Sequence, residues 1–247
     1  MKFLGLLAVC VTVLSALASP AAARPDFQCN GVFKGKTYDD VIVPRGATCT
    51  LVDATVTGDV RVLRSAYLQI THTKVRGDIE GNAAQTVFVD TGSRVGGSVE
   101  SVATRQFFVF NSTVGEDIEP DRTRETVQIC GNTVRKGNIE VRRSGPDTAL
   151  SQHAGTDILI GDPLADGCRG NVVKRGNVIV TRNFADIEFV IRGNSIKRGD
   201  LSVTKNTGPV PKIVANNTGG DRVVCRDNAL TSATRNTGWD RKSGDCA

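Results

Sequence analysis

The sequence predicts an all-β chain folded as a parallel β-solenoid, a coil of short strands in which each turn stacks on the one before. Two observations predict this fold. A degenerate unit recurs at intervals that are mostly 19 to 23 residues, and each unit holds short runs rich in Val and Ile. The composition agrees, because aromatic residues make up only 5% of the 247 residues while 26 are glycine. A narrow core leaves little room for rings, and tight corners favour glycine.

Each unit is marked by Gly-Asp, Gly-Asn or a close variant, followed by an apolar residue that begins a strand, as in "TKVRGDIEG" and "NTVRKGNIEV". We expect these apolar residues to stack in one column. They are Val41, Val60, Ile79, Val99, Ile118, Ile139, Val178, Leu201 and Val223. We call these nine apolar residues the marks. Nine marks predict about nine turns and, at the strand spacing of a sheet, a rod of roughly 43 Å.

Two further positions repeat in each unit. A second run, such as "YLQI", "TVFV" or "DILI", is expected to form the second strand of the turn. A third corner falls at Val56, Val75, Val95, Val114, Val134, Val173 and Ile196. Small polar residues precede it by two positions and become Asn132, Asn171 and Asn194 in later units. We expect these asparagines to form a ladder, each bonding its copy in the next turn.

Residues 1–23 have the pattern of a secretory signal peptide. Lys2 precedes the apolar stretch "FLGLLAVCVTVLSALA", and small residues ending at Ala23 suit cleavage, with Ala18 as the alternative. Cys10 follows Val9, where a lipoprotein signal would carry a small residue. No later apolar run approaches the roughly 20 residues of a membrane span. We therefore expect a secreted chain without a transmembrane span, folded as a single β-helix domain over 24–247. The formal net charge of the full chain is +5, and removal of Lys2 with the signal peptide leaves +4, which is mild and favours solubility.

One interval of 39 residues, between Ile139 and Val178, admits either two turns or one turn with an insertion. Cys130 lies nine residues before Ile139 and Cys168 ten before Val178, so the two hold similar places in their units. In adjacent turns their Cα atoms would lie about 4.8 Å apart, whereas an intervening turn would separate them by about 10 Å, too far for a disulfide. We therefore predict a loop excursion at 142–156 and a Cys130–Cys168 disulfide.

The other four cysteines of the mature chain lie at its ends. Cys29 and Cys49 bracket the first turn, and Cys225 and Cys246 bracket the last, with 226–247 as a C-terminal cap. End turns of a solenoid expose core and strand edges, so covalent closure is useful there. We expect the pairs Cys29–Cys49 and Cys225–Cys246, although six cysteines allow other pairings.

Carboxylates recur at outward positions beside the marks, and we expect a charged face. They are Asp59, Asp78, Glu80, Glu100, Asp117, Glu119 and Glu140. Carboxylates stacked at strand spacing repel by roughly 1 kcal/mol in water, so basic corner residues should offset them. Those residues are Arg76, Arg94, Lys136, Arg175 and Arg198. We interpret the face as solvated; the alternatives are a face for divalent cations or a cationic partner, and a hydrolase carboxylate pair. Calcium would suit such oxygens, but its GGxGxD repeat is absent, so no cofactor and no metal site are expected.

The loop excursion is the one place where a catalytic group could gather. It contains His153 with Asp147, Arg142 and Arg143, a set that could bind or deprotonate an acidic sugar. A lone histidine in such a loop is more often solvated, and we expect His72, the other histidine, to lie exposed on a strand. No copy of the repeated carboxylates stands out as catalytic.

Other binding motifs have structural explanations. Arg-Gly-Asp occurs at 76–78 and 198–200, where the pattern of the repeat places a basic residue before Gly-Asp. Regular threonine arrays for ice binding are confined to two units, and the basic positions lack the interleaved aromatics of nucleic-acid binders. We therefore expect no nucleic-acid partner. The sequons at Asn111 and Asn216 matter only in a eukaryotic source.

The opening "CNG…YDDVIVPRGATCTL", the repeated "NTV.GN" units and the closing "C…G…C" resemble secreted, largely uncharacterised β-helix repeat proteins of actinobacteria. The resemblance spans nearly the whole mature chain, which carries more charged residues than those relatives. It implies a right-handed parallel β-helix in the extracellular space or cell wall, and no established activity.

Together these observations predict a secreted, non-enzymatic β-solenoid with a structural or ligand-binding role, its partner a polysaccharide or another component of the cell envelope. The second hypothesis is a polysaccharide lyase or glycoside hydrolase of the β-helix type, the pectate-lyase-like superfold. It rests on analogy of fold alone.

Overall fold

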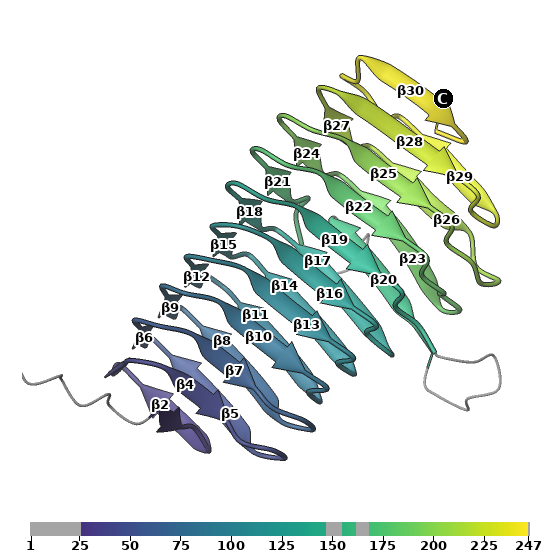
Figure 1. The fold of residues 1–247 in the computed structure, drawn as a ribbon. Coiled ribbons are helices and arrows are strands. Elements are labelled where there is room, and N and C mark those ends of the chain that lie inside the picture. Colours follow the sequence, from purple (N-terminus) through teal and green to yellow (C-terminus); the bar gives the residue numbers. More distant parts are fainter. Residues whose placement is uncertain (1–25, 147–154, 162–167, 247) are drawn as a thin grey trace, which may run out of the picture.

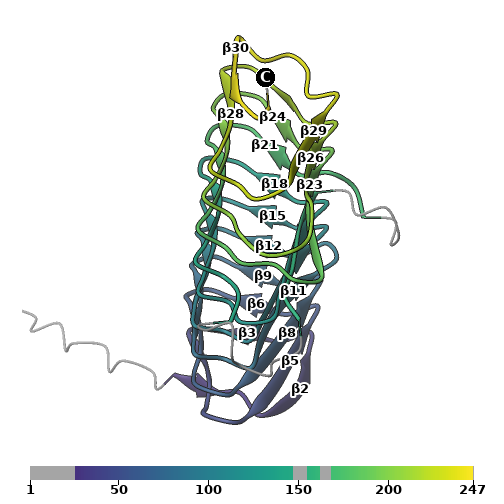
Figure 2. The same cartoon turned by 90° about the vertical axis from the view of Figure 1, so that its right-hand side faces the viewer.

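The computed structural model describes residues 26–146, 155–161 and 168–246. All secondary-structure elements within these residues are β-strands. All strand pairs are parallel, and they form three long sheets that run the length of a rod (Figure 1). The predicted β-solenoid is therefore confirmed. Figure 2 shows the short strands of the third sheet on the side between the two larger sheets.

The first sheet, sheet A, holds the strands that begin at the marked apolar residues. Its strands are β1 (Phe27–Gln28), β4 (Val41–Val43), β7 (Val60–Val62), β10 (Ile79–Asn82), β13 (Val99–Val102), β16 (Ile118–Asp121), β19 (Ile139–Arg142), β22 (Val178–Thr181), β25 (Leu201–Thr204), β28 (Arg222–Arg226) and β30 (Arg241–Gly244).

The second sheet, sheet B, holds the second run of each unit. Its strands are β2 (Gly31–Lys34), β5 (Thr48–Val52), β8 (Tyr67–Thr71), β11 (Thr86–Asp90), β14 (Gln106–Phe110), β17 (Thr126–Cys130), β20 (Asp157–Gly161), β23 (Glu188–Arg192), β26 (Lys212–Ala215) and β29 (Thr231–Thr234).

The third sheet, sheet C, is made of two-residue strands at the predicted corner. They are β3 (Thr37–Tyr38), β6 (Thr55–Val56), β9 (Lys74–Val75), β12 (Arg94–Val95), β15 (Thr113–Val114), β18 (Thr133–Val134), β21 (Val172–Val173), β24 (Ser195–Ile196) and β27 (Thr218–Gly219).

The register confirms the predicted columns. Ile79 pairs with Val60 on one side and Val99 on the other, and the same column continues in register from Val41 to Val223. These residues are fully buried. Because side chains alternate along a strand, the residue after each mark points outward, so the period of the repeat fixes both the core and the outer rows.

The solenoid has about ten turns where the marks predict nine. The additional strands are at the two ends. Strand β1 pairs with β4 before the first mark, and β30 pairs with β28 after the last. Part of the expected cap, 226–247, thus continues sheets A and B as β30 and β29.

The predicted asparagine ladder lies in the core beside sheet C. Asn171 Oδ1 accepts the backbone N–H of Asn132 at 3.0 Å and its side-chain amide at 3.1 Å, while Asn171 Nδ2 donates to the carbonyl of Ile129 at 2.7 Å. The ladder continues through Asn194 and Asn217 to Asn236. Each amide satisfies backbone groups that the corner leaves unpaired, so these asparagines are structural.

The ends of the rod are closed by rings. Phe27 stacks on Tyr38 with ring centroids 4.3 Å apart and meets Phe33 edge-on at 4.9 Å. At the other end Trp239 packs against Gly219, where a Cβ would collide with its ring. Aromatic residues therefore shield the terminal turns, whose apolar cores have no further turn to cover them.

The structure places the three expected cysteine pairs together. Their Cα atoms are 5.4 Å apart for Cys29–Cys49, 5.8 Å for Cys130–Cys168 and 5.2 Å for Cys225–Cys246. Ile139 pairs directly with Val178, which confirms that the 39-residue interval is a single turn. One excursion at 142–156 was expected; the described strands end at Arg142, resume at Asp157, end again at Gly161 and resume at Val172.

The predicted signal peptide, 1–23, lies outside the described residues. In the described part of the chain, no helix is long and apolar enough to cross a membrane.

Candidate functional site

The Gly-Asp corners form a second ladder between sheets C and A. Each polar side chain accepts a hydrogen bond from the backbone N–H of its counterpart one turn later, at 2.6 to 3.2 Å. In order the ladder runs through Asp40, Asp59, Asp78, Ser98, Asp117, Asn138 and Asn177 to Asp200. The aspartates of this charged face, including that of the first Arg-Gly-Asp, therefore have structural partners.

The same contacts explain the glycine before each aspartate. A Cβ at Gly77 would collide with the carboxylate of Asp59, and one at Gly97 with that of Asp78. Where the preceding turn carries the shorter Ser98, the glycine is replaced by Glu116. The Arg-Gly-Asp tripeptides are thus products of packing between turns.

A row of glutamates lies on the outer face of sheet A. Glu80 pairs in register with Glu100, and Glu100 with Glu119. Partial burial raises the pKa of Glu100 above its ordinary value, and Asp78 and Glu80 add to the shift against a hydrogen bond with Ser98. Burial also raises the pKa of Glu119, with the negative charges of Asp117 and Glu140 adding to it. The row is an electrostatically unfavourable arrangement that the fold tolerates.

Nothing in the described part of the chain groups three or more His, Cys, Asp or Glu side chains as metal ligands. A shallow, open hollow lies on the glutamate row, lined by Glu80, Gly81, Asn82, Glu100, Ser101 and Val102 of two adjacent turns. It is a surface depression between neighbouring strands.

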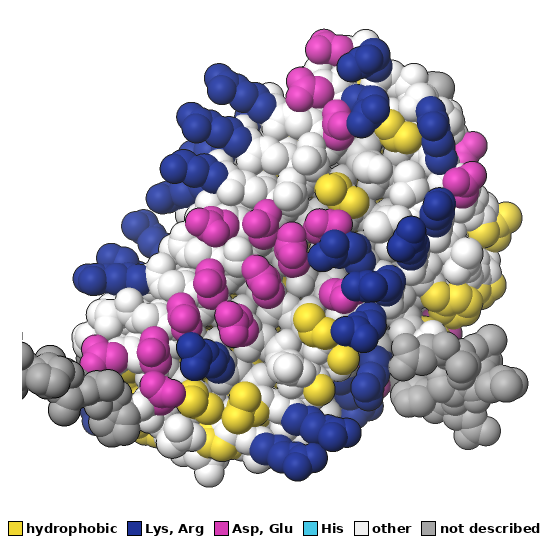
Figure 3. Space-filling model, in the orientation of Figure 1, with side chains coloured by type: hydrophobic (Ala, Val, Ile, Leu, Met, Phe, Trp, Pro, Cys, Tyr) yellow, Lys and Arg dark blue, Asp and Glu magenta, His cyan; other side chains and the backbone are white. Residues whose placement is uncertain are grey.

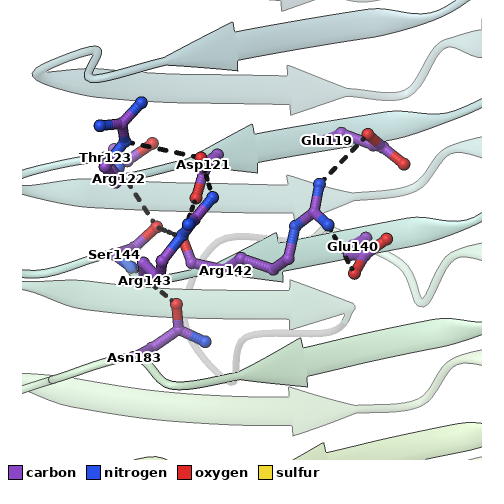
Figure 4. A network of polar contacts seen from close by, with 9 residues as sticks. All are labelled: Glu119, Asp121, Arg122, Thr123, Glu140, Arg142, Arg143, Ser144 and Asn183. Carbon is purple, nitrogen blue, oxygen red and sulfur yellow. Dashed lines mark hydrogen bonds and ion pairs between the residues drawn. The ribbon is translucent and has the colours of Figure 1, made fainter.

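The two arginines of the candidate catalytic set are engaged in ion pairs (Figure 4). Arg142 lies 3.3 Å from Glu140 and 3.6 Å from Glu119. Arg143 donates from Nε to Asp121 Oδ1 at 2.8 Å and from Nη2 to Oδ2, and this carboxylate raises the pKa of Arg143. Both guanidinium groups thus join adjacent turns of sheet A.

The remaining members of that set, His153 and Asp147, lie outside the described residues. His72 is exposed as expected, but it lies at the corner after β8 with a φ of 49°. The sequon residues Asn111 and Asn216 hold the same kind of left-handed corner, with φ of 44° and 54°. Asparagine tolerates that conformation, which gives both positions a structural reason.

We expected basic corner residues to offset the repulsion between the stacked carboxylates. This expectation is wrong in so far as it implies direct contacts between them. The ion pairs of the acidic rows come from other arginines: Arg61 lies 3.9 Å from Asp59, and Arg222 lies 2.8 Å from Asp200. Among the described residues, the side chains of the cations named for that role make no hydrogen bond or ion pair; they are Arg76, Arg94, Lys136, Arg175 and Arg198. Long side chains at a corner extend into solvent instead of folding back.

Three of these cations belong to a larger set that the repeat pattern does not single out. Three adjacent corners between sheets C and A each carry two exposed basic side chains. We call the six residues the basic ladder: Arg135, Lys136, Lys174, Arg175, Lys197 and Arg198. The signal that could have found it is the corner length, because the marks in these units follow the sheet C residue by five positions instead of four.

The surface therefore carries charges of both signs in rows along the rod. Figure 3 shows Lys and Arg lining the edge where Figure 1 places β18, β21 and β24, with a band of Asp and Glu beside it over the middle of the rod. Such rows can hold an extended partner by charge, whereas their side chains are not gathered around one point. No family model, curated protein or solved structure matches this chain.

Proposed function

We propose that this chain is a secreted, non-enzymatic β-solenoid that binds an extended partner of the extracellular space or cell envelope along its outer faces. The observation that carries the proposal is the alignment of exposed charges into rows parallel to the rod axis (Figure 3). A repeated scaffold sets such charges at the strand spacing of about 4.8 Å, which suits a partner that is itself a repeating polymer.

The location is supported by two features. Three cysteine pairs at disulfide distance fit an oxidising compartment. The apolar leader and the resemblance to secreted actinobacterial β-helix proteins point the same way.

The non-enzymatic part of the proposal rests on a chemical argument about the described residues. An acid–base or nucleophilic site needs groups converging on one reacting atom. Here Arg142 and Arg143 bind neighbouring carboxylates, and the aspartates of the charged face accept backbone N–H groups.

One observation favours a second candidate, a polysaccharide-active enzyme. The pKa of Glu119 is raised by burial and by neighbouring acids, as in many functional carboxyls, and Glu119 lies beside Arg142. A hydrolase or lyase would use this pair together with the segment that follows β19.

A single experiment separates the two. The disulfide-bonded protein is incubated with a panel of neutral and acidic polysaccharides while bound protein and released reducing ends or unsaturated products are measured. We expect binding without product. Product release that disappears in Glu119→Gln or Arg142→Ala would establish the enzyme, and failure to bind any polymer would contradict the proposed function.

A further inference from the structure

The basic ladder has a local structure unlike the corners before it. From sheet C to the mark, the four corners that begin at Val56, Val75, Val95 and Val114 span four positions, as from Val114 to Ile118. The corners that begin at Val134, Val173 and Ile196 span five, and in each the two residues after the sheet C strand are basic. Both side chains of each pair are exposed to solvent.

The corners stack closely, which aligns their cations. The backbone N–H of Lys174 donates to the carbonyl of Val134 at 2.9 Å, and that of Lys197 donates to Val173 at 2.8 Å. The carbonyl of Arg175 accepts a hydrogen bond from the backbone N–H of Gly137 at 2.8 Å. The carbonyl of Arg198 accepts one from the backbone N–H of Gly176 at 3.0 Å. The ladder is therefore two parallel rows of three cations, with about 4.8 Å between successive members.

These cations are not used by the fold. None of the six side chains has a hydrogen bond or ion pair among the described residues, and all six are exposed. Like charges at this spacing repel by roughly 1 kcal/mol in water. Equivalent corners do without them, since Gly96 and Gly97 occupy the two positions after Val95. An unpaired row that costs stability is explained by a partner that supplies the opposite charge.

The surroundings of the ladder restrict that partner. The glutamate row of sheet A ends at Glu140, beside the first corner of the ladder, and its column continues as Ile179 and Ser202 beside the other two corners. The row therefore repels an anion only at that end of the ladder, and the uncharged positions beside the later corners leave the edge open to it. At the end of the ladder lies an open hollow lined by Ser195, Ile196, Lys197, Thr218, Gly219 and Gly220. Hydroxyl and backbone groups of this kind suit a hydroxyl-rich chain.

Two other partners fit less well. The half-buried aromatic rings Phe88, Phe108 and Phe110 contact one another on sheet B, away from the ladder, so the ladder offers no platform for stacking bases. The glutamate row of a second copy could pair with it, but exposed ion pairs contribute only about 0.2–1 kcal/mol each. A linear polyanion also releases condensed counterions when it binds.

We propose that the basic ladder binds a linear acidic polysaccharide, its carboxylate or sulfate groups lying along the rod axis. The inference rests on the proposed function and names its partner class. One charged group per sugar gives the chain a repeat close to the strand spacing, so successive cations meet successive anions.

The test compares two variants of equal charge loss. The ladder variant neutralises four of the six cations: Lys174→Gln, Arg175→Gln, Lys197→Gln and Arg198→Gln. The control variant neutralises four exposed cations at the opposite corner of sheet A: Arg45→Gln, Arg64→Gln, Arg182→Gln and Lys205→Gln. Binding of the full chain is measured against polygalacturonate, dextran sulfate, neutral dextran and single-stranded DNA, each at about 50 and 200 mM salt. Sedimentation of the free protein reports self-association.

The wild-type chain is expected to bind one or both acidic polysaccharides, more weakly at the higher salt. The ladder variant should lose about tenfold or more of the association constant, and the control variant much less. The two acidic polymers show whether carboxylate or sulfate is preferred.

Equal losses in the two variants would overturn the inference, because net charge alone would then explain binding. Tighter binding to DNA, or salt-sensitive self-association abolished by the ladder variant, would replace the polysaccharide by another partner. Binding to neutral dextran that the ladder variant leaves unchanged would overturn the inference while the proposed function stands. Binding to no polymer would contradict both.

Discussion

Asp78 of one turn and Ser98 of the next are joined by a hydrogen bond from the Ser98 backbone N–H to Asp78 Oδ1, 2.7 Å long. The same carboxylate occupies the place that a Cβ on Gly97 would need. The acid of one turn thus dictates the glycine of the following turn. Repetition of this contact along the edge of the rod explains why Gly-Asp and Gly-Asn recur, and why two Arg-Gly-Asp tripeptides arise without an adhesion partner.

The coupling predicts a double-mutant result. Gly97→Ala should lower the free energy of unfolding by about 1–3 kcal/mol, because the new methyl group overlaps the Asp78 carboxylate. Adding Asp78→Ser should recover part of this loss. The repeat already contains this combination, because Ser98 holds the position of Asp78 one turn later and is followed in the next turn by Glu116, where Asp78 is followed by Gly97. Urea denaturation of the single and double variants measures the interaction.

Gly220→Ala is the matched control. The nearest atom to its Cβ would be the carbonyl oxygen of Lys197 at 3.3 Å, so the expected change is within about 0.5 kcal/mol. Additive losses in Gly97→Ala and Asp78→Ser would show that the two residues are not coupled.

Replacing Asn171 should be among the most damaging single changes. Asn171→Ala leaves the backbone N–H of Asn132 without its acceptor and the carbonyl of Ile129 without its donor, both inside the core. Each unsatisfied buried group costs about 1–3 kcal/mol, so we expect a loss of about 3 kcal/mol or more. Thermal unfolding checks this, with the exposed Asn82→Ala as control. Equal melting temperatures for the two variants would contradict a structural ladder.

The glutamate row predicts a dependence of stability on pH. The pKa values of Glu100 and Glu119 are raised in the folded protein above the ordinary 4.5. Between 4.5 and the raised value the folded chain binds more protons than the unfolded chain, so the free energy of unfolding falls as pH rises through this window.

Glu100→Gln combined with Glu119→Gln should therefore stabilise the protein at pH 7, and the gain should fade near pH 4. Because both side chains are partly solvated, we expect about 0.5–1 kcal/mol. Urea midpoints at the two pH values measure it, and Glu116→Gln at an exposed corner is the control. A gain that persists unchanged at pH 4 would not come from the carboxyl charges.

The cysteine pairs can be checked by peptide mapping without reduction. We expect Cys29 linked to Cys49, Cys130 to Cys168 and Cys225 to Cys246. A peptide joining Cys130 to a cysteine at either end would be incompatible with its place in adjacent turns.

The columns of the solenoid could be predicted because they depend on spacing alone. The marked residues from Val41 to Val223 stack as their intervals predict. The positions of Cys130 and Cys168 in their units correctly predicted that the 39-residue interval is one turn. A second asparagine ladder was missed. It runs from Asn183 through Asn206 to Asn228 beside sheet A. Its counterparts in earlier turns are Thr104, Thr123 and Ser144, so no asparagine occupies this column before Asn183.

Side-chain direction is what spacing could not supply. Arg142 and Arg143 were grouped with a loop histidine, yet both extend across sheet A to carboxylates of the same or the preceding turn. Lys212 occupies a strand that the pattern identifies, but no pattern indicates that it is buried and donates to the carbonyls of Gly208 and Val210 at 2.7 Å. The long, flexible side chains of Arg and Lys bind whichever acceptor lies within reach in the folded protein, and the spacing of the repeat does not specify that acceptor.

The central claim is that the rod binds an acidic polymer along one edge, and lysine footprinting tests it most directly. The protein is acetylated with and without saturating polygalacturonate or dextran sulfate, and the modified lysines are read by mass spectrometry. We predict that Lys136, Lys174 and Lys197 are protected by the polymer, while the exposed Lys34 and Lys205 are acetylated equally in both samples. Protection of Lys34 and Lys205 with continued acetylation of the three ladder lysines would contradict the account.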